Sequence, residues 1–144
     1  MNKVAVILPV YKNDKVPYIK LSFDSILNQT YGNIHLYVGV DGPVGEDLNA
    51  CLQEYEKDER ISVEWFKDNR GLAIVLNDLL DICFKAGYEY IARMDADDIS
   101  MPNRIEKQMA FLQANPDIDV VGGAIEEIDE NSNSRGKTIV YPEG

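Results

Sequence analysis

The sequence predicts an α/β protein with a mainly parallel sheet and helices on both faces of that sheet. Short apolar runs alternate along the chain with longer segments that repeat apolar residues at helical spacing, which indicates consecutive βαβ units. The first run, residues 4–8, is apolar at every position, as expected for a strand buried on both faces. With 144 residues, 45% of them hydrophobic, the chain is long enough for one well-packed domain, so we expect a single domain over 1–144.

The hydrophobic period places the individual elements. Strands are expected at residues 4–8, 34–40, 61–66, 90–94 and 118–121, with a short candidate at 138–141. Pro9 is expected to end the first strand, because it lacks a backbone N–H. Helices are expected at residues 17–29, 46–57, 72–86 and 102–114, with Pro102 in the first turn of the last one. The polar stretch 126–136 predicts a loop.

Each predicted helix has one apolar face that would pack on the sheet. In the first helix this face consists of Ile19, Phe23, Ile26 and Leu27. In the third helix it consists of Leu72, Val75, Leu76, Leu79, Leu80 and Cys83. Both cysteines, Cys51 and Cys83, lie on such faces, which predicts free thiols in the core and a reducing, cytoplasmic compartment.

The charge balance excludes two classes of partner. The 25 acidic residues against 14 basic residues give a formal net charge of −11. Binding to nucleic acid requires a basic surface, and so does docking on anionic lipid, so neither partner is expected. No apolar run approaches the roughly 20 residues that a membrane span needs, and from the first residues we expect no signal peptide. A small anionic ligand remains open if something cancels the like-charge repulsion.

In open parallel sheets, ligands bind beyond the carboxyl ends of the strands. The segments expected there are Pro9-Val10-Tyr11, Asp41-Gly42, Asn69-Arg70-Gly71 and Asp95-Ala96-Asp97-Asp98.

The acidic segment from Asp95 to Asp98 is the strongest candidate for chemistry. It places three carboxylates within four residues directly after a predicted strand. Mg²⁺ and Mn²⁺ prefer oxygen ligands, and Mg²⁺ is often held by one or two carboxylates together with substrate phosphates. Such a cation would join an acidic protein to an anionic ligand. The alternative is an acidic loop that caps the following helix through Asp98 or Ser100.

Three other positions each allow two interpretations. Asp41 either accepts hydrogen bonds from a nucleotide base or serves as a turn residue before Gly42. Arg70, at a helix entrance, either contacts phosphate or is a solvated arginine. Tyr11 either stacks on a base or lies at the rim of the site.

Taken together, these segments resemble the nucleotide-sugar-binding portion of family 2 glycosyltransferases of the Rossmann-like GT-A fold. The resemblance covers nearly the whole chain in register. The motifs that carry it are Val6 to Tyr11, Ser25 to Tyr31, Val40-Asp41-Gly42, Asn69 to Ala73 with Leu76-Asn77, Asp95 to Asp98, and Met101 to Ile105 with Gln108. Val40 stands where family members often have a second acid.

The resemblance implies a role for each position. Pro9, Val10 and Tyr11 would line the uridine pocket, and Asp41 would receive the base. Asn69, Arg70 and Gly71 would lie by the nucleotide or its phosphates. Asp95 and Ala96 would contact the ribose or sugar, and Asp97, with Asp95, would hold the Mg²⁺ or Mn²⁺ that bridges the diphosphate.

The implied reaction is transfer of a sugar, with inversion, from a nucleotide-diphosphate sugar to a hydroxyl of a saccharide or lipid-linked acceptor in cell-surface polysaccharide synthesis. In this family the catalytic base and the acceptor-binding half follow the segment seen here. We therefore expect a domain truncated at its C-terminus, inactive alone, from a protein that is cytoplasmic or peripheral at the inner face of the membrane. The alternatives are a sugar-nucleotide nucleotidyltransferase and a non-catalytic nucleotide-binding module.

Overall fold

The computed structural model describes residues 2–117, 124–128 and 134–140. The chain divides into two compact units, Met1–Pro102 and Asn103–Gly144.

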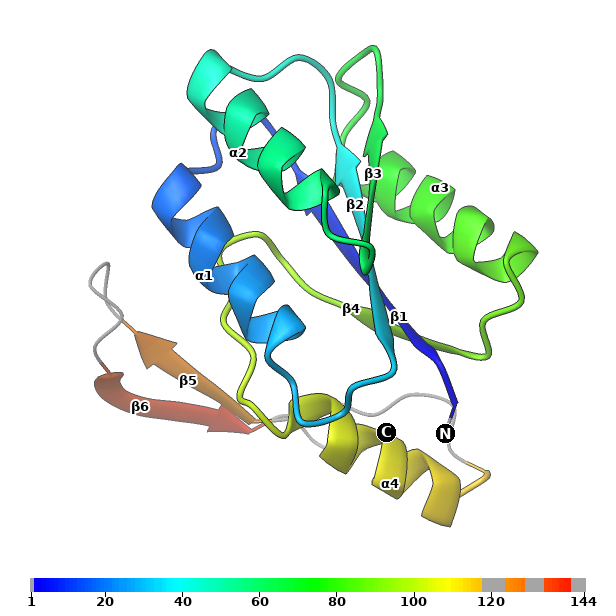
Figure 1. Ribbon diagram of the computed structural model, residues 1–144. Helices are drawn as coiled ribbons and strands as arrows, with labels where there is room; N and C mark the ends of the chain where they lie inside the picture. Colours follow the sequence, from blue (N-terminus) through cyan, green and yellow to red (C-terminus); the bar gives the residue numbers. More distant parts are fainter. Residues whose placement is uncertain (1, 118–123, 129–133, 141–144) are drawn as a thin grey trace. The chain divides into compact units, whose positions relative to one another are not determined.

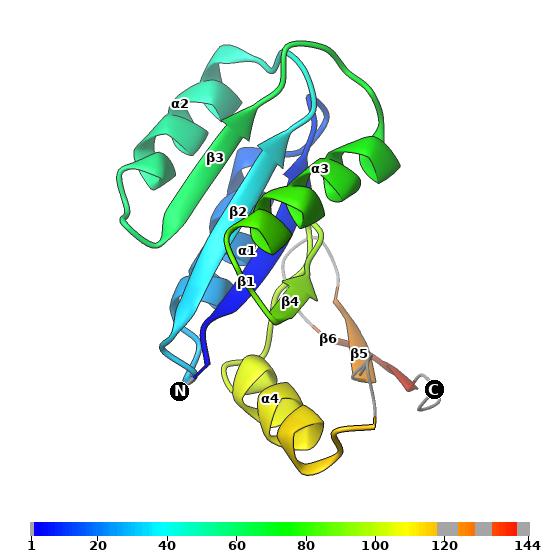
Figure 2. The ribbon, with the colours of Figure 1, turned by 90° about the vertical axis from the view of Figure 1, so that its right-hand side faces the viewer.

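The first unit is a parallel sheet with helices on both faces. Its elements in chain order are β1 (Val4–Val10), α1 (Val16–Leu27), β2 (Ile34–Val40), α2 (Glu46–Glu56), β3 (Ile61–Trp65), α3 (Leu72–Lys85) and β4 (Tyr90–Arg93). The strands are hydrogen-bonded in the order β3-β2-β1-β4, and every pair is parallel. Helices α1 and α2 cover one face of the sheet and α3 covers the other (Figure 1, Figure 2). The predicted α/β class is confirmed, and these elements agree with the sequence prediction to within two residues.

The second unit contains α4 (Arg104–Ala114) and an antiparallel hairpin of β5 (Ala124–Ile128) and β6 (Ser134–Val140). The hairpin corrects the prediction of a loop over 126–136, although β6 includes most of the strand candidate at 138–141. Polar residues form strands here because the two segments pair with each other, as Glu126 does with Thr138, and local composition does not reveal such pairing. The strand predicted at 118–121 lies outside the described residues.

Two prolines were assigned wrongly from the sequence. Pro9 lies inside β1, where alternate residues face β2 and β4. The carbonyl of Ile7 accepts a hydrogen bond from the backbone N–H of Met94, so the backbone of Ile7 faces β4. Pro9, two residues further on, faces the same side but lies beyond Ile7, the last residue of β1 that pairs with β4. Its missing N–H therefore removes no hydrogen bond from the sheet. Pro102 lies before α4, and its carbonyl accepts a hydrogen bond from the N–H of Thr30 at 2.8 Å.

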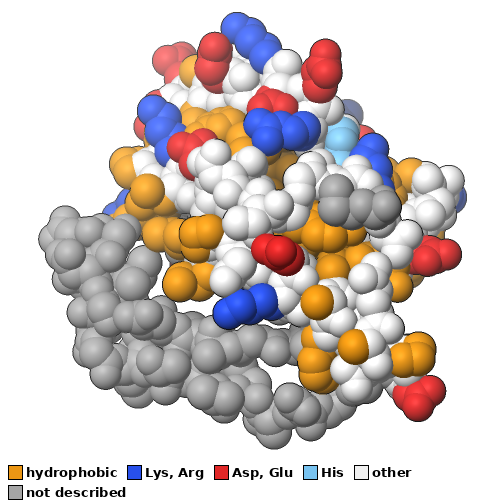
Figure 3. Space-filling view, turned by 60° about the horizontal axis from the view of Figure 1, so that its bottom comes forward, with side chains coloured by type: hydrophobic (Ala, Val, Ile, Leu, Met, Phe, Trp, Pro, Cys, Tyr) orange, Lys and Arg blue, Asp and Glu red, His pale blue; other side chains and the backbone are white. Residues whose placement is uncertain are grey.

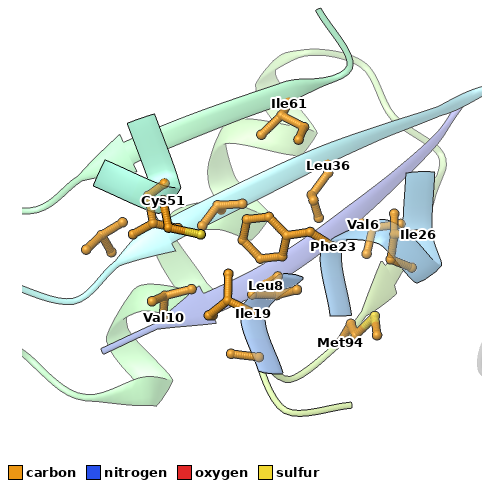
Figure 4. Packing of buried hydrophobic residues seen from close by; sticks show 14 of the residues in the cluster. Val6, Leu8, Val10, Ile19, Phe23, Ile26, Leu36, Cys51, Ile61 and Met94 are labelled. Atoms are coloured by element: carbon orange, nitrogen blue, oxygen red, sulfur yellow. The ribbon is translucent and has the colours of Figure 1, made fainter. Parts of the chain in front are cut away.

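The larger core lies between the sheet and the pair α1 and α2. Phe23 of α1 is fully buried at its centre, between the side chains of β1 and those of β2 and α2 (Figure 4). The second core lies under α3 and contains Ala5, Ile7, Val75, Leu79 and Cys83. Both cysteines are buried and free, as predicted, and burial raises the pKa of the Cys83 thiol to about 11. Leu72 was expected on the buried face of α3 but is 50% exposed, because it occupies the first position of the helix.

Gly39 of β2 allows α3 to approach the sheet closely. A Cβ at this position would lie 2.6 Å from Cγ1 of Val75 and 3.1 Å from Cδ1 of Leu79. A Gly39→Ala variant should therefore lose about 1–3 kcal/mol of unfolding free energy through overpacking. Chemical denaturation measures this loss. The control is Gly32→Ala, whose Cβ would have no neighbour within 4 Å, and an equal loss in both variants would contradict the close approach.

Among the described residues, the structure contains no helix that is long and apolar enough to cross a membrane.

Candidate functional site at the carboxyl ends of the strands

Because β1 to β4 are parallel, their carboxyl ends meet at one edge of the sheet. The segments that follow these ends are the ones singled out in the sequence. The N–H of Asp41, directly after β2, donates to the carbonyl of Val10 at the end of β1 at 2.7 Å. The structure therefore brings the Pro9–Tyr11 segment and Asp41 together.

Asp41 is a buried carboxylate that joins two of these segments. It is only 6% exposed. Its Oδ1 accepts the backbone N–H of Arg70 at 2.7 Å, and its Oδ2 accepts that of Gly71 at 3.0 Å. The side-chain amide of Asn69 donates to the Asp41 carbonyl at 3.2 Å. Asp41 thus holds the loop after β3 in place, a role that neither interpretation of the sequence included. A carboxylate has about four acceptor positions, so these bonds leave capacity for a ligand.

Gly42 makes this close contact between the loops possible. Its φ of +85° is one that L side chains rarely adopt, and a Cβ there would lie 2.7 Å from the backbone nitrogen of Asn69. The turn interpretation of Asp41-Gly42 is therefore correct for the backbone, while the Asp41 side chain has its own function in the loop contact.

Arg70 lies at the start of α3, where the sequence placed it. Its guanidinium lies 4.8 Å from the centre of the Phe66 ring and pairs with Asp78 of α3. The pair is partly exposed, and a surface pair of this kind contributes little to stability. An anion bound at this edge would therefore compete with Asp78 for a guanidinium that is already oriented by Phe66.

The loop after β1 contains an acid that the sequence analysis did not select. The N–H of Tyr11 donates to Oδ2 of Asp14 at 2.9 Å, and the N–H of Asp14 donates to the Tyr11 carbonyl at 3.0 Å. Burial raises the pKa of the Asp14 carboxyl against the opposing effect of the Tyr11 N–H, and the nearby charges of Asp97 and Asp95 raise it further. Asp14 therefore lies near enough to the acidic segment for their charges to interact. Its position in a loop at a strand end is the signal that could have identified it.

The side chains at the end of β1 differ in exposure. Pro9 and Val10 are buried, and Val10 belongs to the larger core at 1% exposure, whereas Tyr11 is 44% exposed. Of these three residues, Tyr11 is the one that presents an open aromatic surface to a ligand.

The acidic segment after β4 forms a turn, in which the N–H of Asp98 donates to the Asp95 carbonyl at 3.1 Å. The Asp95 carboxylate is half-exposed and lies 3.5 Å from the Arg93 guanidinium, while Ala96 is buried. The N-cap position of α4 is Asn103, whose own side chain makes no capping hydrogen bond.

The donor set at this edge fits a hard cation, because Asp14, Asp95 and Asp97 offer oxygen ligands only. Within the described part of the chain, no group of three His, Cys, Asp or Glu side chains is placed to hold a metal ion by itself. A cation bound here would therefore need ligand atoms from a bound phosphate as well as one or two carboxylates.

The described surface has two other features of note. On the described part of the face in Figure 3, acidic and basic side chains are interspersed, without the continuous basic stripe that nucleic acid requires. A pocket of about 490 Å³ lies at the amino ends of β1 and β4, around Lys3, Tyr37 and Tyr88. It lies at the opposite ends of these strands from the candidate site and contains none of the residues selected from the sequence.

Comparison with solved structures assigns the fold to the GT-A class of glycosyltransferases. The chain is similar to Staphylococcus aureus TarS 1-349 in complex with UDP-GlcNAc, with a TM-score of 0.67 and 22% identity over 79% of this chain and 32% of that chain. It is similar to the mannosyltransferase PcManGT from Pyrobaculum calidifontis in complex with GDP-Man and Mn²⁺, with a TM-score of 0.67 and 21% identity over 89% of this chain and 36% of that chain.

The family follows from sequence comparison. The chain belongs to Glycosyl transferase family 2, whose profile matches residues 5–142. It is 36% identical over 143 residues to the O-antigen biosynthesis glycosyltransferase WbnJ of Escherichia coli, and the matched region covers 99% of this chain and 53% of the relative. It is 30% identical over 135 residues to the amylovoran biosynthesis glycosyltransferase AmsE of Erwinia amylovora, and the matched region covers 94% of this chain and 50% of the relative. The chain thus spans about half the length of these curated relatives. The matching model is that of a glycosyltransferase family, which favours this class over the nucleotidyltransferase alternative.

Proposed function

We propose that this chain is the donor-binding portion of an inverting, metal-dependent glycosyltransferase. The donor is a nucleotide-diphosphate sugar, with UDP as its nucleotide, and the acceptor is a hydroxyl of a saccharide or lipid-linked saccharide in polysaccharide synthesis. The observation that carries the proposal is the arrangement at the sheet edge, where loops after four parallel strands bring Tyr11, Asp41, Arg70 and Asp95-Ala96-Asp97 to the same side.

Each loop has a separate part in binding the donor. Tyr11 stacks on the base, and the Asp41 carboxylate accepts a hydrogen bond from the base edge with the acceptor positions that Arg70 and Gly71 leave. The backbone of Asn69 and Gly71 lies beside the nucleotide, and the Arg70 guanidinium turns from Asp78 to the phosphates.

The acidic segment solves the charge problem posed by an acidic protein and an anionic donor. Asp97 and Asp95 are the residues that would hold Mg²⁺ or Mn²⁺ together with the diphosphate oxygens. When bound, the cation supplies Lewis-acid stabilisation of the charge that grows on the departing nucleoside diphosphate. Asp95 and Ala96 also orient the ribose and sugar, so that the face of the anomeric carbon opposite the diphosphate is open to the acceptor hydroxyl.

We further propose that the general base and the acceptor-binding half belong to sequence outside these 144 residues, so that this chain alone transfers no sugar. The support is the share of the relatives that the chain covers, about half. The free, buried thiols of Cys51 and Cys83 suit a reducing compartment, and we place the protein in the cytoplasm or at the inner face of the membrane.

Calorimetry with UDP tests the donor site directly. Binding is expected in the presence of Mn²⁺ or Mg²⁺ and should be lost when the cation is removed by EDTA. An Asp97→Ala variant should lower the apparent affinity for UDP with Mn²⁺ by at least about tenfold, or about 1.4 kcal/mol.

The matched control is Asp81→Ala, which removes an exposed carboxylate paired with Lys85 on α3 and should leave the affinity unchanged. UDP binding at full strength without a divalent cation would contradict the bridging role of Asp97. Sugar transfer by the 144-residue chain itself would contradict the proposal that the base lies elsewhere.

A further inference from the structure

Helix α1 has a line of polar side chains next to its apolar face. Ser22 is fully buried, and Gln29, just beyond the helix end, is 8% exposed. With Ser25 they lie three and four residues apart, which is the spacing that places side chains on one side of a helix. We call Ser22, Ser25 and Gln29 the polar stripe of α1. Part of the stripe belongs to the Ser25–Tyr31 motif, which the proposed function leaves without a role.

Every residue of this stripe bonds to the backbone that follows β4. Ser22 Oγ donates to the Asp95 carbonyl at 3.2 Å, and Ser25 Oγ accepts the Ser100 N–H at 3.0 Å. Gln29 Nε2 donates to the Met101 carbonyl at 2.6 Å. The segment that leaves β4 runs alongside α1 (Figure 1).

The stripe is itself ordered by the helix. Ser25 Oγ donates its proton to the Ser22 carbonyl at 2.7 Å, which directs an oxygen lone pair at Ser100. Gln29 Nε2 uses its second hydrogen on the Ser25 carbonyl at 3.0 Å. The side chains of Ser25 and Gln29 are therefore already ordered by their bonds to the backbone of α1. Little further side-chain entropy is lost when they bond to the segment after β4.

These hydrogen bonds hold the backbone of the acidic segment, which has no regular secondary structure to do so. Residues 95–101 form no helix or strand, and their carboxylates repel one another, so ordering them is unfavourable unless other groups hold the backbone. The bonds from the stripe end on backbone atoms and not on the Asp95 or Asp97 carboxylates. They fix the course of the chain and leave the carboxylate oxygens available to a ligand.

We propose that Ser22, Ser25 and Gln29 are positioning residues, which hold the Asp95–Met101 segment in the geometry that binds the cation and the diphosphate of the donor. This inference rests on the proposed function, since it assigns to Asp95 and Asp97 the cation given there. Outer groups that orient metal ligands typically change metal affinity by about 10–100-fold when they are removed.

The test uses Gln29→Leu, which keeps the size of the side chain and removes both of its donors, and Ser25→Ala as a second variant. Hydrogen exchange in the free chain should become faster in residues 95–101, while the amides of β1 and β2 keep their protection. Calorimetry with UDP and Mn²⁺ should show an affinity lower by about tenfold or more. Ser25→Thr retains the hydroxyl and should restore both quantities.

The matched control is Tyr55→Phe, which removes a hydrogen bond of 2.8 Å from Tyr55 to Asp24 and so loosens α1 without affecting the stripe. It should lower the melting temperature and leave the affinity and the exchange of residues 95–101 unchanged. If Gln29→Leu and Ser25→Ala behave like this control, the stripe is only structural and the inference is wrong. If the unaltered chain fails to bind UDP with Mn²⁺, the proposed function fails, and the positioning role falls with it.

Discussion

An Asp41→Ala variant is expected to lose about 2–3 kcal/mol of unfolding free energy and, with it, the ordered loop at the entrance of α3. Hydrogen bonds to a charged group contribute about 1.5–3 kcal/mol, and Asp41 accepts bonds from Arg70 and Gly71 with separate oxygens. Arg70 and Gly71 are both more exposed residues than Asp41, which favours access of water to their N–H groups in the variant. This compensation keeps the expected loss well below the sum for two such bonds.

Chemical denaturation measures this loss, and the Asp41→Asn variant gives the comparison. Asparagine keeps one acceptor oxygen for one of the two backbone N–H groups but presents an NH₂ group to the other. The stability of Asp41→Asn should therefore lie between that of the unaltered chain and that of Asp41→Ala. Calorimetry with UDP and Mn²⁺ at a temperature where all three are folded then tests the proposed base contact. A loss below about 0.5 kcal/mol for Asp41→Ala, the range of an ordinary surface substitution, would show that Asp41 does not hold the loop.

A Phe23→Ala variant should have the larger effect on stability, about 3–5 kcal/mol, since it removes a fully buried ring from the centre of the larger core. The Phe23 ring also meets that of Tyr55 edge to face, with centroids 4.9 Å apart. Small domains have total stabilities of about 5–15 kcal/mol, so this single change removes a large part of the total.

The control for this prediction is the same substitution at Phe84, which lies on α3 and is 65% exposed. Phe84→Ala should change the unfolding free energy by no more than about 0.5 kcal/mol. Denaturation curves of the two variants compare the sites. Equal losses would show that the outer face of α3 is covered in solution or that Phe23 does not occupy the core.

Most of the first unit was predictable because its signals are local. Strand β2 was predicted with its observed bounds, and the buried face of α1 was identified from residues that the structure buries, among them Ile19, Phe23 and Ile26. The rule for open parallel sheets also predicted that the candidate segments share one edge of the sheet, and they do, because parallel strands end on the same side.

The errors came from features that depend on distant partners. The position of Pro9 inside β1 was missed, since it depends on β4 ending before it, and the β5–β6 hairpin was missed, since its polar residues are strands only when paired. Asp14 was passed over because nothing in its own segment shows that its charge interacts with those of Asp95 and Asp97.

The sequence by itself determined the order of the elements of the first unit, the family, and which segments meet at the candidate site, because hydrophobic period and motif spacing are properties of neighbouring residues. The tertiary structure alone decided what the side chains do there. It joined Asp41 to the loop of Arg70 and Gly71, and it set the polar stripe of α1 against the backbone of the acidic segment. Such contacts join residues from 29 to 75 positions apart, and only the folded chain brings them within hydrogen-bonding distance.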